Sequence, residues 1–203
     1  MNQPSGPLSG LRVIEFSGIG PGPHVAMLLA DLGAEVVRVD RPGAGVGNPV
    51  VERARHRLAV DLKSDDGKAQ VRAAVANADV LITTAAIPGR RSPLIVSEAM
   101  IGGMKNGALV VDMAAEGGGN CAGTVAGKTV KMGGVTLIGP LNLPARMPVH
   151  ASEMFARNLF NFISPWLGEG ALNLDWDDEI VAGACLTREG ELVHAGVRNV
   201  LGL

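Results

Sequence analysis

The first forty residues hold the feature that constrains the fold most: two short apolar runs separated by a turn and a helical segment. Residues 11–16 (LRVIEF) are typical of a strand, and the glycine- and proline-rich turn SGIGPGP follows directly. Residues 24–32 place their apolar side chains on one helical face, and residues 35–39 form a β-branched run that ends at Asp40. Strand, helix and strand in this order predict the right-handed crossover of a parallel sheet.

The rest of the chain continues this alternation of strands and helices. Further strands are expected at 58–62, 80–83 and 109–113, and further helices at 64–77, 97–104 and 152–163. One hairpin is expected around Gly133-Gly134, with arms 128–132 and 135–139, and its second arm is expected to join the sheet. A last hairpin is expected around residues 188–190, with strands 179–186 and 191–194 as its arms.

Strands that alternate with helices indicate the α/β class. No linker separates two apolar cores, so residues 1–203 are expected to form one Rossmann-like domain with an extra β-hairpin. Its doubly wound parallel sheet is predicted to have the strand order 3-2-1-4-5-6.

Charge and cysteine content exclude several classes of protein. The net charge of −2 attracts neither nucleic acid nor an anionic membrane, and no run of eighteen apolar residues is present. Residues 1–10 are polar, and the two cysteines, Cys121 and Cys185, lie far apart, which favours a reduced, cytoplasmic protein. The four histidines are scattered, and neither H-x-x-x-H nor C-x-x-C occurs, so no metal site is expected.

The first turn is an imperfect dinucleotide fingerprint. The pattern G-x-G-x-x-G is met at Gly18 and Gly20, but Pro23 stands in the third place. Shifted by two residues, Gly20 and Gly22 fit and Val25 takes the third place. The turn can point backbone N–H groups at a phosphate, except at Pro21 and Pro23, which have none, and the alternative is a plain strand-to-helix turn.

Asp40 follows the second expected strand, 20 residues after Gly20. An acid at this place holds the adenine ribose of NAD in dinucleotide-binding domains. Its neighbours Arg38 and Arg41 favour a ribose phosphate instead, and the alternative to both is a solvated strand end.

Residues 6–43 and 52–67 closely resemble the N-terminus of the α-methylacyl-CoA racemases, which are family III CoA-transferases. The resemblance implies that Arg38 and Lys63 lie near the adenosine phosphate of CoA. The pantetheine and acyl parts of that family's site lie elsewhere, so at most an ADP-like head is expected to bind here. The alternative is a pair of surface charges.

From about Asp79 the sequence resembles the NAD(H)-binding domain of the transhydrogenase α subunit. The matching segments include ADVLITTAAIPGRRSP, LVVDMAAEGGGNCAGTV and GVTLIGPLNLPARMP. The resemblance implies that three loops line the nicotinamide half of an NAD site, through Thr83, Thr84 and Ala85, then Ala114, Ala115 and Glu116, then Asn142. The alternative is loop geometry alone.

The two resemblances together predict a fusion of a racemase-like half (1–75) with a transhydrogenase-like half (76–203), joined within 67–81. The proton-abstracting His and Asp of racemases have no counterpart, so no catalytic residue is expected. The sequence therefore predicts a non-catalytic hybrid domain with residual NAD(H), ADP or CoA binding. The alternatives are the NAD(H)-binding part of a transhydrogenase and a racemase fragment.

Residues 120–139 resemble a transhydrogenase hairpin that reaches a second subunit. Val130, Met132, Val135, Leu137 and Ile138 make its arms apolar, so they need cover. A homodimer through this hairpin is expected, and the alternative is that the hairpin folds onto its own domain.

Overall fold

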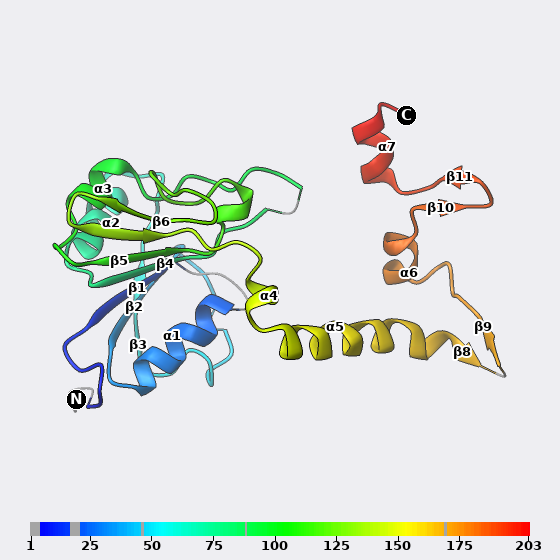
Figure 1. Ribbon diagram of the computed structural model, residues 1–203, viewed down its shortest axis with the longest axis horizontal. Coiled ribbons are helices and arrows are strands. Elements are labelled where there is room, and N and C mark those ends of the chain that lie inside the picture. The colour runs from blue at the N-terminus through cyan, green and yellow to red at the C-terminus, as the bar shows by residue number, and fades with distance from the viewer. Residues whose placement is uncertain (1–4, 17–20, 46, 88, 169) are drawn as a thin grey trace. The chain divides into compact units, whose positions relative to one another are not determined.

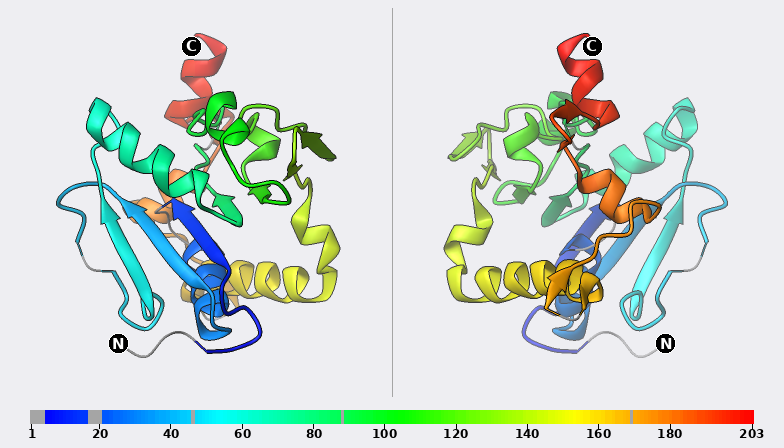
Figure 2. Two further views of the ribbon diagram at one scale, coloured as in Figure 1. Left: turned by 90° about the vertical axis from the view of Figure 1, so that its left-hand side faces the viewer. Right: turned by 90° about the vertical axis from the view of Figure 1, so that its right-hand side faces the viewer.

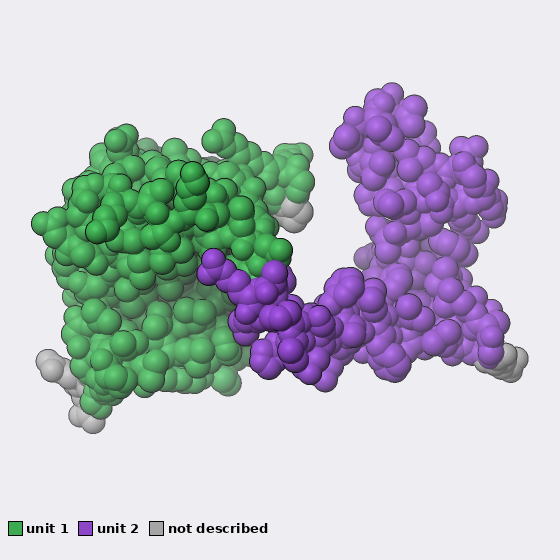
Figure 3. Space-filling view, in the orientation of Figure 1, with its two compact units in different colours: residues 1–143 green, residues 144–203 purple. Residues whose placement is uncertain are grey.

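The computed structural model describes residues 5–16, 21–45, 47–87, 89–168 and 170–203. The chain forms two compact units, Met1–Leu143 and Pro144–Leu203, which Figure 3 colours separately. The expected sheet lies entirely in the first unit.

A seven-stranded sheet in the order β3-β2-β1-β4-β5-β7-β6 is the frame of the first unit (Figure 1). Its strands are β1 (Arg12–Phe16), β2 (Glu35–Asp40), β3 (Arg55–Ala59), β4 (Val80–Thr83), β5 (Leu109–Asp112), β6 (Thr129–Met132) and β7 (Val135–Ile138). All neighbours pair in parallel except β6 and β7, which form the expected hairpin. The predicted Rossmann-like order is therefore confirmed, with β7 as its sixth parallel strand, and strands from both sides of residue 75 share one sheet.

Helices cover both faces of this sheet (Figures 1 and 2). Helix α1 (Pro21–Asp31) places Ala26 and Ala30 against Val13 and Val36. The other face carries the larger core, where α2 (Asp65–Ala76) and α3 (Glu98–Gly102) pack on strand residues that include Ile14, Leu81, Val110 and Leu137. Short, all-apolar central strands were expected because both of their faces are buried.

Helix α2 begins and ends where its sequence predicts. The side chain of Ser64 accepts a hydrogen bond from the backbone N–H of Gly67, and Asn77 ends the helix. Gly67 packs directly on the carbonyl oxygen of Asp61, which leaves no room for a Cβ. This contact fixes the turn between β3 and α2.

The third strand lies earlier than predicted, at Arg55–Ala59 rather than 58–62. Its pairing runs from Val36↔Arg55 to Asp40↔Ala59. The prediction missed the start because Arg55 and Arg57 look unsuited to a sheet. Both are accommodated through ion pairs with acids on β1 and β2, which apolar periodicity does not reveal.

The β6–β7 hairpin folds onto its own unit, as the alternative to the dimer supposed. Val135 and Leu137 are buried in the larger core, and Val130 and Met132 pack against it. Cover for these arms thus comes from within the chain. The homodimer stays a prediction.

The second unit contains helices and short hairpins. Its elements are α4 (Leu143–Arg146), α5 (Pro148–Ile163), the 3-10 turn η2 (Ser164–Trp166), β8 (Leu167–Gly168), β9 (Ala171–Leu172), α6 (Glu179–Ala184), β10 (Thr187–Arg188), β11 (Glu191–Leu192) and α7 (Ala195–Leu201). The helix expected at 152–163 begins four residues earlier because Pro148 suits a first helical position.

The strand predicted at 179–186 is wrong: residues Glu179–Ala184 are helix α6. Asp178 caps this helix, its carboxylate accepting from the N–H groups of Ile180 and Val181. The hairpin is shorter than predicted, and it turns at Glu189 and Gly190, which both have left-handed backbone.

Candidate functional site

The candidate site lies at the carboxyl ends of β1, β2, β4 and β5. The strand order reverses between β1 and β4, and ligands of open α/β sheets bind in the crevice outside such a switch point. Most of the residues proposed from the sequence gather at this edge. They do so because the loops after β4, β5 and β7 are tied together by specific hydrogen bonds.

Asp112, the last residue of β5, is the centre of this arrangement. Its fully buried carboxylate accepts five hydrogen bonds and has no cation as partner among the described residues. The donors are Thr83 Oγ1 (3.2 Å), Ala114 N (3.2 Å), Asn120 N (2.7 Å), Cys121 N (3.0 Å) and Thr124 Oγ1 (2.7 Å). One side chain thereby positions β4 and both ends of the glycine-rich loop at 117–119.

Asn120 connects that loop to the loop after β4. Its amide oxygen accepts from the N–H of Ala85 at 2.9 Å, and its amide nitrogen donates to the carbonyls of Ala85 (2.9 Å) and Pro93 (2.8 Å). Because Asn120 is buried, these bonds are shielded from water. Two loops that would otherwise move separately are held as one surface.

A third tie reaches the loop after β7. The N–H of Asn142 donates to the carboxylate of Glu116 at 2.6 Å, and Asn142 has a left-handed backbone (φ 46°). Ala114 is buried, and its carbonyl accepts from the hydroxyl of Ser92 at 3.3 Å. The structure therefore brings together the three loops that the transhydrogenase resemblance implied.

The start of α1 meets this edge at Gly22. A Cβ at Gly22 would lie 3.2 Å from the side chain of Thr84, so the helix approaches the end of β4 closely. Gly18 and Gly20 lie outside the described residues. Of the proposed fingerprint, only Gly22 is placed by the structure.

Asp40 ends β2, as predicted, but its carboxylate already forms ion pairs with two arginines. Its carboxylate oxygens pair with Arg38 Nε at 3.0 Å and Arg57 Nε at 2.8 Å, and only 1% of its side chain is exposed. Arg38 also pairs with Glu52. Arg38 is therefore taken up by two acids and is not among the residues that line the hollow beside Lys63.

A second buried ion pair extends the same face of the sheet. Arg55 pairs with Glu15, and 1% of each side chain is exposed. Oε1 of Glu15 and Nε of Arg55 have no hydrogen-bond partner. Burial raises the pKa of Glu15 above its ordinary value, and the nearby Arg55 cation opposes that rise.

Three hollows lie at or beside this edge of the sheet. A crevice of about 280 Å³ is lined by residues that include Val39, Asp40, Ala85 and Ile95. Beside it, Arg41 and Lys63 flank an open hollow of about 580 Å³. Another hollow of about 580 Å³ lies between the loops after β4 and β5, and it contains Arg90, Arg91 and Glu116.

Sequence reasoning missed Asp112 and Asn120, the two residues that fix the loops. A signal was available, because an acid directly after an apolar strand and an Asn directly after GGG are suited to capping loop amides. Polar residues in such places need partners when they are buried.

Neither metal nor thiol chemistry is favoured at this edge. In the described part of the chain, no three His, Cys, Asp or Glu side chains cluster as metal ligands would. Burial raises the pKa of the Cys121 thiol to about 12, so the sulfur stays protonated at neutral pH. Among the described helices, none combines the length and apolar character needed to cross a bilayer.

Comparison with known proteins gives its strongest support to the transhydrogenase resemblance. The family model described as the C-terminal domain of alanine dehydrogenase/PNT matches residues 21–195. An NAD(P) transhydrogenase alpha-subunit protein of Rhodospirillum rubrum is 42% identical over 118 residues, which are 57% of this chain and 31% of the relative. This chain spans about a third of the length of that relative.

A solved structure agrees with the fold. The transhydrogenase from Sinorhizobium meliloti superposes with a TM-score of 0.76 at 33% identity, covering 90% of this chain and 52% of the other. The human alpha-methylacyl-CoA racemase is 47% identical over 75 residues, which are 37% of this chain and 20% of the racemase. The family match crosses residues 67–81, so it does not mark a join there.

Proposed function

This chain belongs to the family of alanine dehydrogenase/PNT C-terminal domains, and we propose that its first unit binds NAD(H) at the carboxyl edge of the sheet. The observation that carries the proposal is the fixed arrangement of the loops after β4 and β5. Asp112 and Asn120 hold them beside the switch-point crevice before any ligand arrives. A preorganised site loses less entropy on binding.

The hollows suggest how the dinucleotide lies. The crevice between Val39, Ala85 and Ile95 is mostly apolar, with Asp40 and Arg41 also in its lining, and it takes the adenine. The pyrophosphate lies at the start of α1, where the helix dipole favours an anion and the N–H of Gly22 is a donor, whereas Pro21 and Pro23 have no backbone N–H. The nicotinamide then reaches the loops that Glu116 and Asn142 tie together.

Asp40 contacts the adenine ribose in this arrangement. An ionised carboxylate has about four lone-pair sites. Arg38 and Arg57 each use one, so two remain for ribose hydroxyls. Asp40 also lines the adenine crevice, which puts it at the required position.

A nucleotide with a ribose phosphate, as in CoA, is a second candidate. Arg41 and Lys63 line the hollow next to the adenine crevice, and both are exposed cations. Two cations at that position are suited to a phosphate on the adenine ribose. Arg38, which the racemase resemblance also implied, is committed to Asp40 and Glu52 instead.

The chain acts as a binding domain and has no turnover of its own in this proposal. Hydride transfer needs two nicotinamides in near-attack geometry, and one nucleotide site provides only one. We expect neither racemisation of 2-methylacyl-CoA nor hydride transfer from NADH to an NADP analogue. Turnover above background in either assay, lost on a point substitution in this chain, would contradict this aspect of the proposal.

The proposed homodimer is tested separately by light scattering. A mass near 20.9 kDa at tens of micromolar chain would refute it. If a dimer forms, Val125→Asp tests the segment around the hairpin, because Val125 is 41% exposed and lies outside the core.

Calorimetric titration with NADH and with CoA tests the ligand. Ala85→Leu places a larger side chain in the adenine crevice and leaves too little room for the adenine. It is therefore expected to weaken NADH binding at least about tenfold. Ala69→Leu, on the exposed face of α2, is the matched control and should bind as the parent does. If both variants bind NADH with the same affinity, the crevice is not the site of the adenine.

A further inference from the structure

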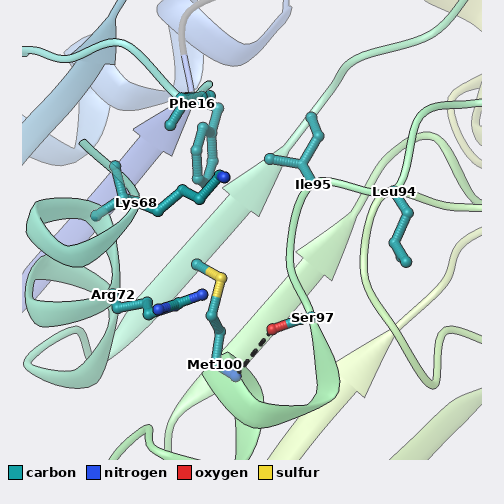
Figure 4. Close-up of a pocket in the computed structure, with 9 residues that line it drawn as sticks. Phe16, Lys68, Arg72, Leu94, Ile95, Ser97 and Met100 are labelled. Carbon is teal, nitrogen blue, oxygen red and sulfur yellow. Dashed lines mark hydrogen bonds between the residues drawn. The ribbon is translucent and has the colours of Figure 1, made fainter. Parts of the chain in front are cut away.

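A second hollow lies on the α2 side of the sheet, and its chemistry differs from that of the adenine crevice. Its volume is about 340 Å³, and it lies between α2, the end of β1 and the segment that leads into α3 (Figure 4). That volume is at the lower end of the range for small-molecule sites. The described residues that line it include no acid.

Two cations on α2 face this hollow. Lys68 and Arg72 are four residues apart, so they lie on the same side of the helix. Figure 4 shows both side chains extending from α2 across the hollow, Lys68 toward Phe16 and Arg72 toward Met100. Like charges at this spacing repel each other, and an anion between them would turn that repulsion into attraction.

These cations are weakly committed within the protein. The side chain of Arg72 makes no hydrogen bond or ion pair with any residue that the structure describes. Within the described part of the chain, Lys68 pairs only with Asp65, at 3.3 Å, and both side chains are well exposed. Exposed pairs of this kind contribute little, so a ligand can replace Asp65 at small cost.

The rest of the hollow is apolar. Phe16 and Val71 are buried residues of its lining, and Ile95 and Met100 line it as well. The hydroxyl of Ser97 accepts from the N–H of Met100 and begins α3, which leaves its O–H able to donate. The surface therefore offers two cations and one hydroxyl donor to the polar end of a ligand, and apolar contact to the remainder.

We propose that this hollow binds a small organic carboxylate with an apolar body, its carboxylate held by Lys68 and Arg72. The planar guanidinium of Arg72 donates two parallel hydrogen bonds to a carboxylate, and the body packs on Phe16, Ile95 and Met100. The hollow adjoins the adenine crevice, because Phe16 and Ile95 line both. Lys68 and Arg72 do not line the adenine crevice, so the carboxylate is held outside it.

The test is an NMR titration of the full chain with 4-phenylbutyrate, which has a carboxylate and an apolar body. We expect saturable shifts at the amides of Phe16, Arg72 and Met100. Arg72→Gln is expected to weaken binding about tenfold, and Lys68→Gln somewhat less, because each removes a charge-assisted bond. Lys128→Gln removes an exposed cation elsewhere and should leave the affinity unchanged.

Four further measurements complete the test. Neutral 4-phenylbutanol should bind at least about tenfold more weakly, and Met100→Trp, which fills the hollow without changing its charge, should abolish binding. Phenethyl phosphate tests whether a phosphate head is accepted in place of the carboxylate. NADH titration of Arg72→Gln should match the parent, so failure of the NAD(H) proposal would be seen separately.

Two results would overturn the assignment. One is the absence of saturation at millimolar 4-phenylbutyrate. The other is saturable binding that Arg72→Gln, Lys68→Gln and Met100→Trp leave unchanged. Preserved dispersion of the variant spectra ensures that lost binding is not lost folding.

Discussion

The two halves of the sheet's carboxyl edge are held in different ways. After β4 and β5, the loops are fixed by uncharged donors around Asp112 and by the amide of Asn120, all of them buried or half-buried. After β2 and beside β3, positions are set by ion pairs between arginines and acids, some of them partly exposed. Hydrogen bonds shielded from water define one geometry, whereas partly exposed ion pairs exchange with salt and ligands.

The difference has a structural cause. Helix α1 connects β1 to β2 and covers the sheet there, but residues 41–54 between β2 and β3 form no described helix. The acids and arginines on this face are largely buried, so each of them needs a partner of opposite charge. We infer that the loops after β4 and β5 are rigid, and that the β2–β3 side adapts to its ligand.

The largest expected effect is that of Asp112→Ala. It leaves up to five donors without an acceptor, three of them backbone N–H groups. Each buried unpaired donor costs about 1–3 kcal/mol. The free energy of unfolding is therefore expected to fall by an amount on the order of 4–6 kcal/mol, because the loops relax and some donors find water. Urea unfolding measures it.

Asp112→Asn keeps one acceptor oxygen and should lose about half as much. Asp65→Ala removes a fully exposed carboxylate and should change the midpoint little. If Asp112→Ala lowers the free energy of unfolding no more than Asp65→Ala does, Asp112 does not fix the loops after β4 and β5, and the contrast with the ion-paired β2–β3 side is wrong.

Arg55→Met is the corresponding change on the ion-pair side. It leaves Glu15 buried and unpaired, which costs about 3–5 kcal/mol at pH 7. The raised pKa of Glu15 means that the folded state binds its proton more tightly than the unfolded chain. This group therefore favours folding below its ordinary pKa and opposes folding as the pH rises above it.

Removing the Arg55 cation raises the pKa of Glu15 further. The variant should therefore lose more stability than the parent between about pH 4.5 and pH 7. Urea midpoints at both ends of that range check this. Arg53→Met, which breaks an exposed pair with Asp31, is the matched control and should follow the parent's pH dependence. A variant curve parallel to that of the parent would contradict the account.

Asn120→Ala should have an intermediate effect on stability, about 1–3 kcal/mol, because its bonds to Ala85 and Pro93 are lost. NADH binding should weaken by more than this loss of stability explains, since the loop after β4 is released. Hydrogen exchange at Ala85 should speed up while exchange in β1 stays the same. Unchanged exchange at Ala85 would show that the loop is fixed by other contacts.

Much of the fold follows from the sequence, and the reasons are local. The crossover at the N-terminus, the cap at Ser64 and the apolar strands β4 and β5 each have a strong short-range signal. The start of β3 and helix α6 were missed because their prediction relied on apolar periodicity, whereas each of the two elements depends on a hydrogen bond or ion pair of a polar side chain. Arg55 needs Glu15, 40 residues away, and α6 depends on the cap of Asp178.

The sequence predicted which residues line the candidate site, but not the contacts that hold them in place. Strand-end positions such as Thr83, Ala85 and Ala114 follow from the order of parallel strands and from family resemblance. The engagement of Asp40 by two arginines and the role of Asp112 depend on contacts between distant segments. Hydrophobic periodicity carries no information on such contacts.

The smallest expected effect is that of Lys63→Ala. Lys63 is exposed, and its backbone N–H, not its ammonium, bonds to Asp61. Stability should therefore change little. CoA binding, if it occurs, should weaken a few-fold and lose some of its salt dependence, while NADH binding should be unaffected. Equal losses for both ligands would place a phosphate common to NADH and CoA at Lys63.

The central claim is that the carboxyl edge binds NAD(H), and hydrogen–deuterium exchange with and without saturating NADH tests it most directly. The account predicts slower exchange in residues 84–95 and 113–119 and around Asp40, with little change on the outer strand β6. No protection at millimolar NADH, or protection confined to other regions of the chain, would contradict it.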